Sequence, residues 1–445
     1  MSDKKVAVLG LGATGLSCVN FLLSQNYDVT VFDTRQLPPG EDKLNASVEL
    51  IKGQLDAGLL AEFKLIIASP GIALATPALQ FALQAGCEII GDIELFARAQ
   101  QQPEYAHAKL VTITGSNGKS TVTSLLGEMA CEAGVKTAVG GNIGIPALDL
   151  LAPEIELYIL ELSSFQLETT FSLNADVATI LNVSEDHLDR YESYQDYTQA
   201  KHRIYQQSRN CLFNRDDLLT LPKVVNKAQV SFGFDSSAYG LVCDAQNNIC
   251  LARNGQALLS TASLKLSGKH NWMNALAALA LGDAVNLDEQ AMLQTLQSYT
   301  GLKHRCEFIA QRSGIRWIND SKATNIGAAL AALQGLSETI SGDVHVILGG
   351  DGKGADFSEL STVLEEIQGL ILCFGADGQK IAAFNSRAVV VNDLQQAVAM
   401  IAAEGKTGDL AILSPACASL DMYPNFMARG DHFRNLVTAL QAGGV

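Results

Sequence analysis

Short apolar runs alternate with segments of helical periodicity through the first hundred residues of the chain. The apolar runs are rich in valine, isoleucine and leucine, and they predict strands at residues 6–9, 29–32 and 65–68. Apolar positions spaced for one helix face predict helices at residues 16–24 and 78–84. Such alternation is typical of a parallel sheet flanked by helices. We therefore predict an α/β domain over residues 1–97, ending before the polar stretch 100–104.

The same alternation returns twice further along the chain. In the middle it predicts strands at residues 110–114, 157–160 and 178–181, and helices at 120–133 and 271–282. Between residues 210 and 266 short β-like pieces dominate, which predicts a small sheet on the flank of this domain. Towards the end it predicts strands at 315–318, 344–348, 370–374 and 410–413, and helices at 326–333 and 394–403. We expect a central domain at residues 98–302 and a third domain at 303–445.

Composition and charge narrow the classes of function. With 445 residues the chain is long enough for roughly three domains of about 150 residues. The formal charge of −16 argues against nucleic acid as a partner, because that binding depends on Lys and Arg. No apolar run approaches the roughly 20 residues that span a bilayer. The N-terminus has no signal-peptide pattern, so we predict a cytoplasmic protein with no membrane partner. The nine cysteines are scattered and predict neither disulfides nor a zinc site.

A glycine-rich turn joins the predicted strand 110–114 to the predicted helix 120–133. Its residues are Gly115, Ser116, Asn117, Gly118, Lys119, Ser120 and Thr121. In such a turn backbone N–H groups cradle phosphates, the lysine neutralises the β- and γ-oxygens, and the hydroxyl holds Mg²⁺. The loop is shorter than the usual template, because Ile113 stands where the template has its first glycine. Its place between strand and helix favours an ATP or GTP site over an ordinary surface turn.

A second glycine motif follows the first predicted strand. Gly10, Gly12 and Gly15 are spaced as in a dinucleotide fingerprint, and Asp33 ends the next strand about 20 positions later. This pattern fits NAD, and it equally fits another nucleotide diphosphate such as a UDP-sugar, with Asp33 and Arg35 holding the base or ribose. The glycines could also serve close packing of helix on strand alone. The spacing leaves these alternatives open.

Polar residues follow several buried strands of the central domain. Glu161 ends an apolar strand, where α/β proteins place ligand sites and where a nucleotide-bound Mg²⁺ needs an oxygen ligand. His187 follows another strand beside three carboxylates, which favours a site over a structural role. Asn142 lies in a glycine-rich turn that by itself resembles an ordinary loop. The helical pattern around Lys201 predicts a surface lysine with no role in a site.

The third domain has small polar turns after its predicted strands. These turns lie at residues 301–305, 319–325, 349–353 and 414–419. Because the carboxyl ends of parallel strands meet at one edge of a sheet, we expect the turns to line a single ligand face. Their cationic members, Arg305, Lys322 and Lys353, indicate an anionic substrate or transition state.

The order of these motifs closely resembles that of the Mur ligases of bacterial cell-wall synthesis, and the resemblance covers essentially the whole chain. Ten blocks carry it: GLGATGLS from Gly10, ASPGIAL from Ala68, GDIELF from Gly91, TGSNGKSTVT from Thr114, GGNIG from Gly140, LELSSFQLE from Leu160, EDHLDRY from Glu185, NDSKATN from Asn319, GGDGK from Gly349 and SPACASLD from Ser414. The likeness implies a Rossmann-like N-terminal domain, a central P-loop ATPase-type parallel sheet with a small flanking β-sheet, and a Rossmann-like C-terminal domain. The short phosphate loop is itself shared with this family.

The resemblance also implies what each domain binds. The first domain of these enzymes holds the UDP part of a UDP-sugar peptide, so the fingerprint glycines are expected to serve UDP and not NAD. The positions that match contacts to this moiety are Ala13, Thr14, Asp33, Thr34, Arg35, Ser69 and Gly71. ATP is expected at the phosphate loop, with further contacts at Asn271, Asn274, Arg305 and Asp320.

For the reaction itself, the resemblance implies two Mg²⁺ ions. Ser120 and Glu161 match ligands of the first, and His187 matches a contributor to the second. Lys201 matches a carbamylated lysine, whose carbamate ligates Mg²⁺. Asn142 matches a residue beside the reacting carboxylate, and Gln166 a substrate contact. Catalytic roles are thereby implied for Lys119, Asn142, Glu161, His187 and Lys201.

The implied activity is ATP-driven amide formation through an acyl phosphate. The likeness is greatest to the members that add D-glutamate to UDP-N-acetylmuramoyl-L-alanine, and a monomer is the family expectation. The expected amino-acid pocket consists of Lys322, Thr324, Lys353, Ser419, Leu420 and Phe426. A different amino acid is an alternative, although the Asp-Asn-Pro-Arg signature of the diaminopimelate-adding members is absent. An NAD-dependent dehydrogenase and a nucleotide-controlled binding protein are the alternatives from other classes.

Overall fold

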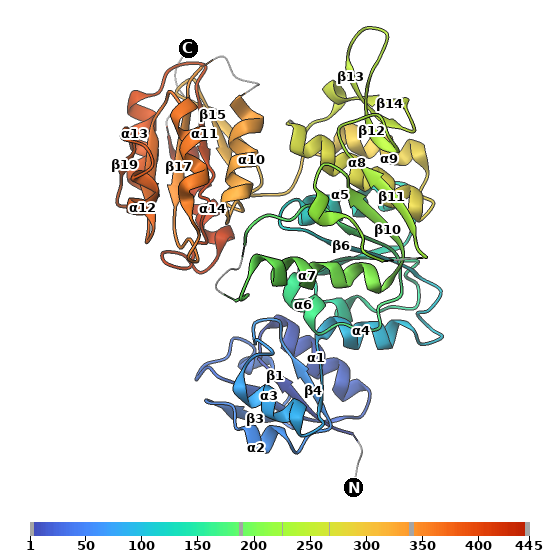
Figure 1. Ribbon diagram of the computed structural model, residues 1–445. Coiled ribbons are helices and arrows are strands. Elements are labelled where there is room, and N and C mark those ends of the chain that lie inside the picture. Colours follow the sequence, from blue (N-terminus) through green and yellow to red (C-terminus); the bar gives the residue numbers. More distant parts are fainter. Residues whose placement is uncertain (1–3, 187–189, 225, 267, 338–341, 441–445) are drawn as a thin grey trace.

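The computed structural model describes residues 4–186, 190–224, 226–266, 268–337 and 342–440. Three sheets, each flanked by helices, form three α/β domains (Figure 1). In this view the N-terminal domain lies at the bottom, the central domain above it and the C-terminal domain at the upper left. The predicted three-domain α/β fold is confirmed. No helix in the described part of the chain has both the length and the apolar character needed to cross a membrane.

The N-terminal sheet is wholly parallel, with strand order β3-β2-β1-β4-β5. Its strands are β1 (Lys5–Leu9), β2 (Asp28–Asp33), β3 (Glu49–Lys52), β4 (Leu65–Ala68) and β5 (Glu88–Ile90). Its helices are α1 (Ala13–Ser24), α2 (Ala57–Leu60) and α3 (Pro77–Gln84). Residues 6–9 of β1 are fully buried, as expected for a parallel strand covered on both faces. The chain order reverses at β1, and in open parallel sheets such a reversal marks the carboxyl-end position where ligands bind.

Helix α4 (Asp92–Gln100) connects the first domain to the second. It contacts α1 of the first domain and the central-domain elements η2 (Ala147–Leu150) and α6 (Ser164–Glu168). Phe96 of α4 packs edge-on against Tyr158 of the central sheet, with ring centroids 5.4 Å apart. The predicted domain boundary at residue 97 falls within this bridging helix.

The central sheet has nine strands in the order β14-β13-β12-β11-β10-β9-β6-β8-β7. Its parallel core consists of β6 (Lys109–Thr114), β7 (Thr137–Gly141), β8 (Leu157–Glu161), β9 (Ala175–Ile180) and β10 (Ser208–Asn214). Helices α5 (Lys119–Glu132), α7 (Tyr194–Gln206), α8 (Lys269–Ala284) and α9 (Glu289–Ser298) accompany it.

The predicted flanking strands are present, but they extend the central sheet and do not form a separate one. They are β11 (Ala228–Phe232), β12 (Tyr239–Cys243), β13 (Ile249–Arg253) and β14 (Gln256–Ser260). β11 pairs in parallel with β10, and β12 joins β11 through the single pair Phe232–Tyr239. This narrow link carries the antiparallel ribbon β12–β13–β14 away from the core. The sequence pattern showed the strands but not the partner of β11.

The C-terminal sheet has the strand order β15-β16-β20-β17-β18-β19. Its strands are β15 (Glu307–Arg312), β16 (Ile315–Asn319), β17 (Val344–Gly349), β18 (Ile371–Phe374), β19 (Val389–Val390) and β20 (Leu410–Leu413). β15 is antiparallel to β16, and the other pairs are parallel. The helices are α10 (Ile326–Ser337), α11 (Leu360–Glu366), α12 (Gly378–Ala382), α13 (Leu394–Glu404) and α14 (Phe426–Ala439).

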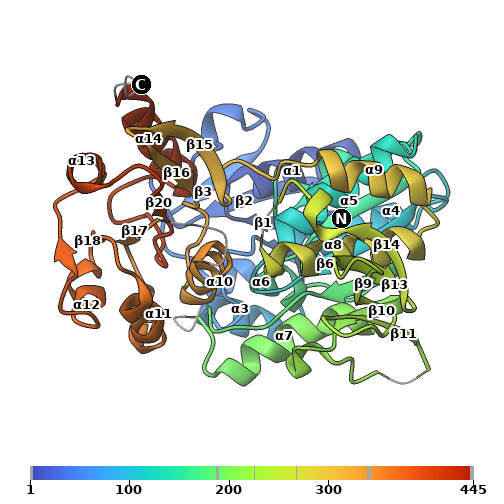
Figure 2. The same cartoon turned by 90° about the horizontal axis from the view of Figure 1, so that it is seen from above.

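The C-terminal and central domains meet along α10. This helix contacts α8 of the central domain, and both views place it on the side of the C-terminal domain that faces the central sheet (Figures 1 and 2). The loop before α10 follows the carboxyl end of β16. It thereby brings the polar turn 319–325 toward the phosphate loop of the central domain.

Candidate active site

A cavity of about 1000 Å³ lies between the central and C-terminal domains. The central domain contributes the glycine-rich turn, the end of β8 and the start of α8. The C-terminal domain contributes Arg305, Cys306, the turn after β16 and Lys353, and Gly301 and Leu302 line the cavity from the segment that leads into this domain. Residues far apart in the sequence therefore line one space. Among the described residues, six cationic ones line it although the whole chain carries a charge of −16: Lys119, Lys201, Lys269, Arg305, Lys322 and Lys353.

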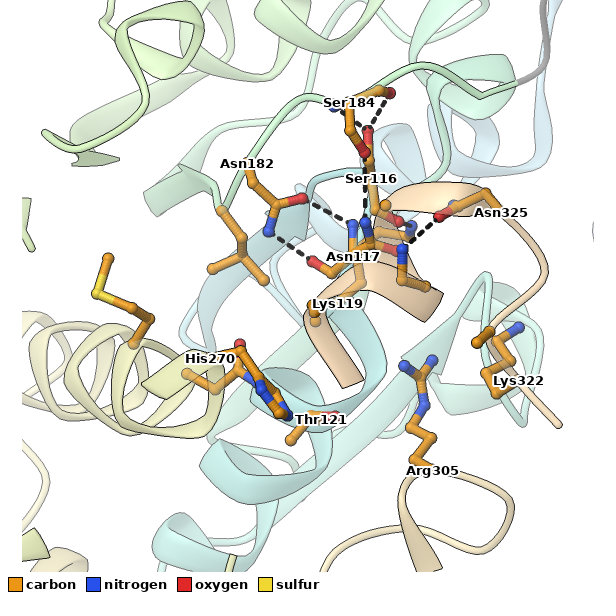
Figure 3. Close-up of a pocket in the computed structure, with 18 of the residues that line it drawn as sticks. Ser116, Asn117, Lys119, Thr121, Asn182, Ser184, His270, Arg305, Lys322 and Asn325 are labelled. Carbon is orange, nitrogen blue, oxygen red and sulfur yellow. Dashed lines mark hydrogen bonds between the residues drawn. The ribbon is translucent and has the colours of Figure 1, made fainter. Parts of the chain in front are cut away.

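The glycine-rich turn is held from the carboxyl end of β9. Asn182 Oδ1 accepts a hydrogen bond from the backbone N–H of Asn117 at 2.8 Å, and its Nδ2 donates to the carbonyl of Asn117 at 3.0 Å. Ser116 Oγ donates to the carbonyl of Ser184 and accepts from its N–H, both at 2.9 Å (Figure 3). These four hydrogen bonds fix the conformation of the loop.

Gly118 precedes α5 in a left-handed conformation, with φ at +80°. A Cβ at this position would lie 2.6 Å from Oδ1 of Asn274, so only glycine fits. The contact places α8, which carries Asn271 and Asn274, directly against the loop. The first N–H groups of α5 have no partner within the helix and present an anion site.

Lys119 lies at the first position of α5. Its Nζ donates to the carbonyls of Gly115 at 2.8 Å and Ser116 at 3.0 Å. Burial lowers the pKa of Lys119. A phosphate chain in the cavity would offer this ammonium group a charged acceptor, which is a stronger partner than the two carbonyls.

Glu161 provides a carboxylate at the end of β8, as predicted. Its side chain is buried, and Oε1 accepts a hydrogen bond from Asn142 Nδ2 at 2.8 Å. Burial by itself would raise the pKa of Glu161, but the charge of Lys119 and neighbouring polar groups lower it below its ordinary value. Oε2 is buried and has no hydrogen-bond partner among the described residues. A buried, ionised and unpartnered oxygen beside a phosphate loop suits Mg²⁺.

The described residues contain no group of three or more His, Cys, Asp and Glu side chains that could enclose a metal ion. A nucleotide-bound Mg²⁺ takes one or two protein ligands and completes its shell with phosphate oxygens and water. Ser120 is buried at the start of α5, and Glu161 lines the cavity. These residues fit one such ion. His187, predicted at a second ion, lies outside the described residues.

Lys201 corrects the prediction of a surface lysine. Its side chain on α7 is 2% exposed, and Nζ donates to the carbonyl of Gly115 at 3.0 Å. Nζ also lies 4.5 Å from the centre of the Tyr197 ring, one turn earlier on the same helix. Burial and the nearby charge of Lys119 lower the pKa of Lys201 well below its ordinary value. The helical pattern did not reveal this burial, because Lys201 lies on the face of α7 that packs against the central sheet.

Tyr197 has a place in the site that the sequence analysis missed. Its hydroxyl is 3.0 Å from Ser116 Oγ, so the helix that carries Lys201 is tied to the phosphate loop. The spacing of four residues between Tyr197 and Lys201 was available as a signal, because such pairs share a helix face.

Arg305 and Lys322 bring positive charge from the C-terminal domain. Arg305 Nη2 donates to Ser120 Oγ at 2.7 Å, across the domain boundary. Lys322 Nζ lies 4.1 Å from the centre of the Phe426 ring. Burial and the charges of Arg305 and Lys119 lower the pKa of Lys322 to about 8. Both side chains line the cavity on the side away from His270 (Figure 3).

Asp186 joins the two domains and was also missed. Oδ1 forms an ion pair with Lys353 Nζ at 2.9 Å, and Oδ2 accepts from Asn325 Nδ2 at 3.1 Å. Both partners belong to the C-terminal domain. The sequence analysis saw Asp186 as one of three carboxylates near His187, but no spacing predicted partners about 140 and 167 residues away.

The remaining predicted ATP contacts also lie at the cavity. Asn271, Asn274 and Asp320 line it. Burial raises the pKa of Asp320 to about 6, although Ser414 Oγ donates to its Oδ2 at 2.8 Å. His270 adds a group the sequence analysis did not consider. Its Nδ1 is buried with no hydrogen-bond partner among the described residues, and burial lowers its pKa to about 4.

The predicted UDP contacts gather at the carboxyl ends of β1, β2 and β4. Asp33 Oδ2 accepts from the N–H of Leu11 at 2.7 Å, and Arg35 Nε donates to Oδ1 at 2.8 Å. The Arg35 guanidinium lowers the pKa of Asp33 to about 2. Asp33 therefore shapes the glycine turn, and the half-exposed Arg35 faces solvent. The other predicted contacts begin α1 or follow β2 and β4: Ala13, Thr14, Thr34, Ser69 and Gly71.

Other predicted substrate contacts differ in their setting. Asn142, Thr324 and Lys353 line the cavity. Gln166 is buried elsewhere: its Nε2 donates to Asp92 Oδ2 at 3.0 Å, and its Oε1 accepts from the N–H of Ser163 at 3.1 Å. Ser419 is buried and Leu420 is 71% exposed. The substrate roles of these residues stay predictions.

Three family models match successive parts of the chain. They are described as the N-terminal domain of MurD-like Mur ligases (residues 4–91), the Mur ligase middle domain (113–282) and the glutamate ligase domain of Mur ligases (304–417). The chain belongs to the Mur ligase family. Among its relatives, UDP-N-acetylmuramoylalanine–D-glutamate ligase of Escherichia coli K12 is 51% identical over 440 residues, 98% of each chain. The ligase of the same name from Aliivibrio fischeri MJ11 is 51% identical over 436 residues, 97% of each chain.

Solved Mur ligase structures share the fold at low identity. UDP-N-acetylmuramate-alanine ligase from Thermotoga maritima has a TM-score of 0.62 and 18% identity, covering 98% of this chain and 99% of its own. The MurF ligase of Thermotoga maritima, solved in complex with ADP, has a TM-score of 0.60 and 14% identity, covering 97% and 95%. The three-domain arrangement is thus common to Mur ligases whose sequences have diverged widely.

Proposed function

We propose that this Mur ligase joins D-glutamate to UDP-N-acetylmuramoyl-L-alanine in peptidoglycan precursor synthesis, with cleavage of ATP to ADP and phosphate. One observation carries the proposal. A phosphate loop and a buried carboxylate of one domain share a cavity with the cationic side chains of another. The relatives that are 51% identical over nearly the full chain carry this activity in their names. The activity of an NAD-dependent dehydrogenase would not explain why a phosphate loop, a buried carboxylate and cationic side chains line one cavity.

The chemistry requires two anions to approach each other. The substrate carboxylate attacks the γ-phosphorus of ATP, the bond to the β-phosphate breaks, and ADP leaves. The neutral amine of D-glutamate then attacks the carbonyl carbon of the acyl phosphate, phosphate leaves, and the nitrogen releases one proton. Lys119 and Arg305 are placed to offset the repulsion between carboxylate and polyphosphate. Lys322 and Lys353 line the same cavity, and we expect them to hold the carboxylates of D-glutamate.

Mg²⁺ supplies further neutralisation of the phosphates when bound, and Ser120 and Glu161 would hold it. We propose that Lys201 carries a carbamate. Carbamate formation joins the neutral amine nitrogen to the carbon of CO₂ and releases one proton. Burial favours the neutral amine that this step needs, because it lowers the pKa of Lys201. Because the carbamate is an anion with two oxygens, it would also reduce the cost of burying this side chain among cations.

Replacement of Glu161 by glutamine should lower kcat about a hundredfold, a loss typical of one electrostatic group in an active site. The amide keeps the shape and the oxygen that Asn142 contacts, but it removes the charge that would hold Mg²⁺. Initial rates over a Mg²⁺ titration check this, and the variant should need more Mg²⁺ for half-maximal rate. A variant with the wild-type Mg²⁺ dependence would argue against Glu161 as a ligand.

The KM for D-glutamate should rise as the pH increases through about 8. The cationic form of Lys322 pairs with a carboxylate, and its pKa of about 8 means that the free enzyme loses this form above that pH. The Lys322→Arg variant should keep a flatter profile, because arginine stays charged. The ionisation of D-glutamate itself affects the pH profiles of the wild type and the variant equally. The same rise in both profiles would show that Lys322 is not responsible.

The proposed activity is tested by phosphate release from ATP in the presence of UDP-N-acetylmuramoyl-L-alanine and single amino acids. D-glutamate should stimulate release far more than L-alanine, L-lysine or diaminopimelate. Equal stimulation by several amino acids would contradict the assignment of D-glutamate. ATP hydrolysis that ignores both the UDP-sugar and the amino acid would favour a nucleotide-controlled binding protein.

A further inference from the structure

Arg190 connects the N-terminal and central domains at a point that none of the steps above uses. Its side chain is 14% exposed, and Nη1 donates to the carbonyl of Pro70 at 2.5 Å. The guanidinium carbon lies 3.9 Å from the centre of the Phe165 ring, and Nη2 is 3.5 Å from Glu168 Oε2. Pro70 belongs to the N-terminal domain, whereas Phe165 and Glu168 lie on α6 of the central domain. One side chain thus contacts both domains.

The Pro70 side of this contact belongs to the proposed UDP site. The N–H of Ser69 donates to the carbonyl of Leu9 at 3.0 Å, and Ser69 Oγ donates to the carbonyl of Gly10 at 3.2 Å. Ser69, which directly precedes Pro70, is therefore bonded to the glycine turn that is expected to hold the diphosphate. A shift of Pro70 would move both loops of that site.

The α6 side of the contact belongs to the reaction centre. α6 begins three residues after Glu161, and Ser163 and Gln166 fix its start with a reciprocal pair of side-chain-to-backbone hydrogen bonds. Phe165 also lines the cavity beside the phosphate loop. The guanidinium therefore connects the UDP loops to the helix that follows the strand end carrying the proposed Mg²⁺ ligand.

We propose that Arg190 is a positioning residue that holds the UDP-binding loops in register with the reaction centre. The identity of the ligand rests on the proposed function. A planar guanidinium can donate to Pro70, face Glu168 and lie over the Phe165 ring at once, which a lysine cannot do. The substrate must reach from the UDP site to the γ-phosphate of ATP, so the distance between these two sites decides how well it binds in a reactive position.

The test compares Arg190→Met with Arg203→Met. Arg203 makes contacts of the same kind within the central domain: it donates to the carbonyls of Leu167 at 2.7 Å and Thr170 at 3.1 Å, and its guanidinium lies 5.2 Å from the Phe171 ring centre. We expect Arg190→Met to raise the KM for the UDP-sugar about tenfold, corresponding to about 1.4 kcal/mol. The KM values for ATP and D-glutamate should stay within about twofold. Arg203→Met should leave all three unchanged within that range.

Arg190→Lys provides a second variant, with Arg203→Lys as its control, in case the methionine variants unfold. Its KM for the UDP-sugar should lie between those of the wild type and Arg190→Met. A KM for the UDP-sugar no higher than in the Arg203 control would overturn the proposal, as would an equal rise in all three KM values. If the wild type shows no ligase turnover, the proposed function fails. The positioning role is then decided by titration calorimetry with UDP on the same variants.

Discussion

Replacement of Lys119 by methionine should reduce kcat/KM for ATP-dependent product formation about a thousandfold, the upper range for loss of one charged group that stabilises a transition state. Lys119 begins α5, and its Nζ now contacts two carbonyls of the phosphate loop. Among the described lysines that contact the phosphate loop, Lys119 is the one that belongs to the loop itself. Without Lys119, the charge that develops during phosphoryl transfer would lack the cation that the phosphate loop itself supplies. Product formation followed by chromatography measures the loss.

Lys109→Met is the matched control for Lys119→Met. Lys109 lies on β6, the strand that leads into the loop, but at its opposite end, where Nζ donates to the carbonyl of Val285 at 2.7 Å. This variant should lose some stability and keep its kcat/KM within about twofold. A Lys119→Met enzyme with more than a tenth of wild-type kcat/KM would contradict the role assigned to the phosphate loop.

Replacement of Lys201 by alanine should abolish measurable turnover, again with a loss of about a thousandfold. The amine is buried beside the phosphate loop, so its removal takes away the proposed carbamate and leaves a hole between α7 and the loop. ¹³C NMR of wild-type protein in [¹³C]bicarbonate should show a carbamate signal that Lys201→Ala lacks. Depletion of CO₂ should slow the wild-type enzyme reversibly.

Lys227→Ala controls for stability in this experiment. Lys227 Nζ donates to the carbonyl of Tyr205 at 2.7 Å at the end of the same helix, and it does not line the cavity. Its removal should destabilise α7 and leave turnover intact. A folded Lys201→Ala enzyme with wild-type turnover would disprove the carbamate. An active wild-type sample that shows no ¹³C carbamate signal would disprove it as well.

The glycine-rich turn shows what the sequence could establish from local pattern. The turn lies between β6 and α5 as predicted, because an apolar β-branched run and a helical stretch mark its two sides. Glu161 is likewise buried at the end of β8, since an apolar strand leaves its last residue at the sheet edge. The pattern of apolar residues is therefore enough to predict a site residue when the strand, turn and helix that position it are consecutive in the chain.

Lys201 and Asp186 show why the rest could not be predicted in this way. The burial of Lys201 depends on how α7 packs on the sheet and on the approach of Gly115, 86 positions earlier. Asp186 meets Lys353 only because the C-terminal domain lies against the central one. Neither contact can be read from the pattern of apolar and polar residues, because each joins residues far apart in the sequence. For Lys201 the resemblance to the Mur ligases supplied a role that spacing could not.

The most direct measurement follows oxygen atoms through the reaction. UDP-N-acetylmuramoyl-L-alanine with ¹⁸O in its terminal carboxylate is incubated with the wild-type enzyme, ATP, Mg²⁺ and D-glutamate, and the released phosphate is analysed by mass spectrometry. If the carboxylate is activated by ATP, each phosphate released should carry one ¹⁸O atom, and one should remain in the new amide. Amide product accompanied by unlabelled phosphate, or phosphate release without any amide product, would contradict an ATP-driven ligase at this cavity.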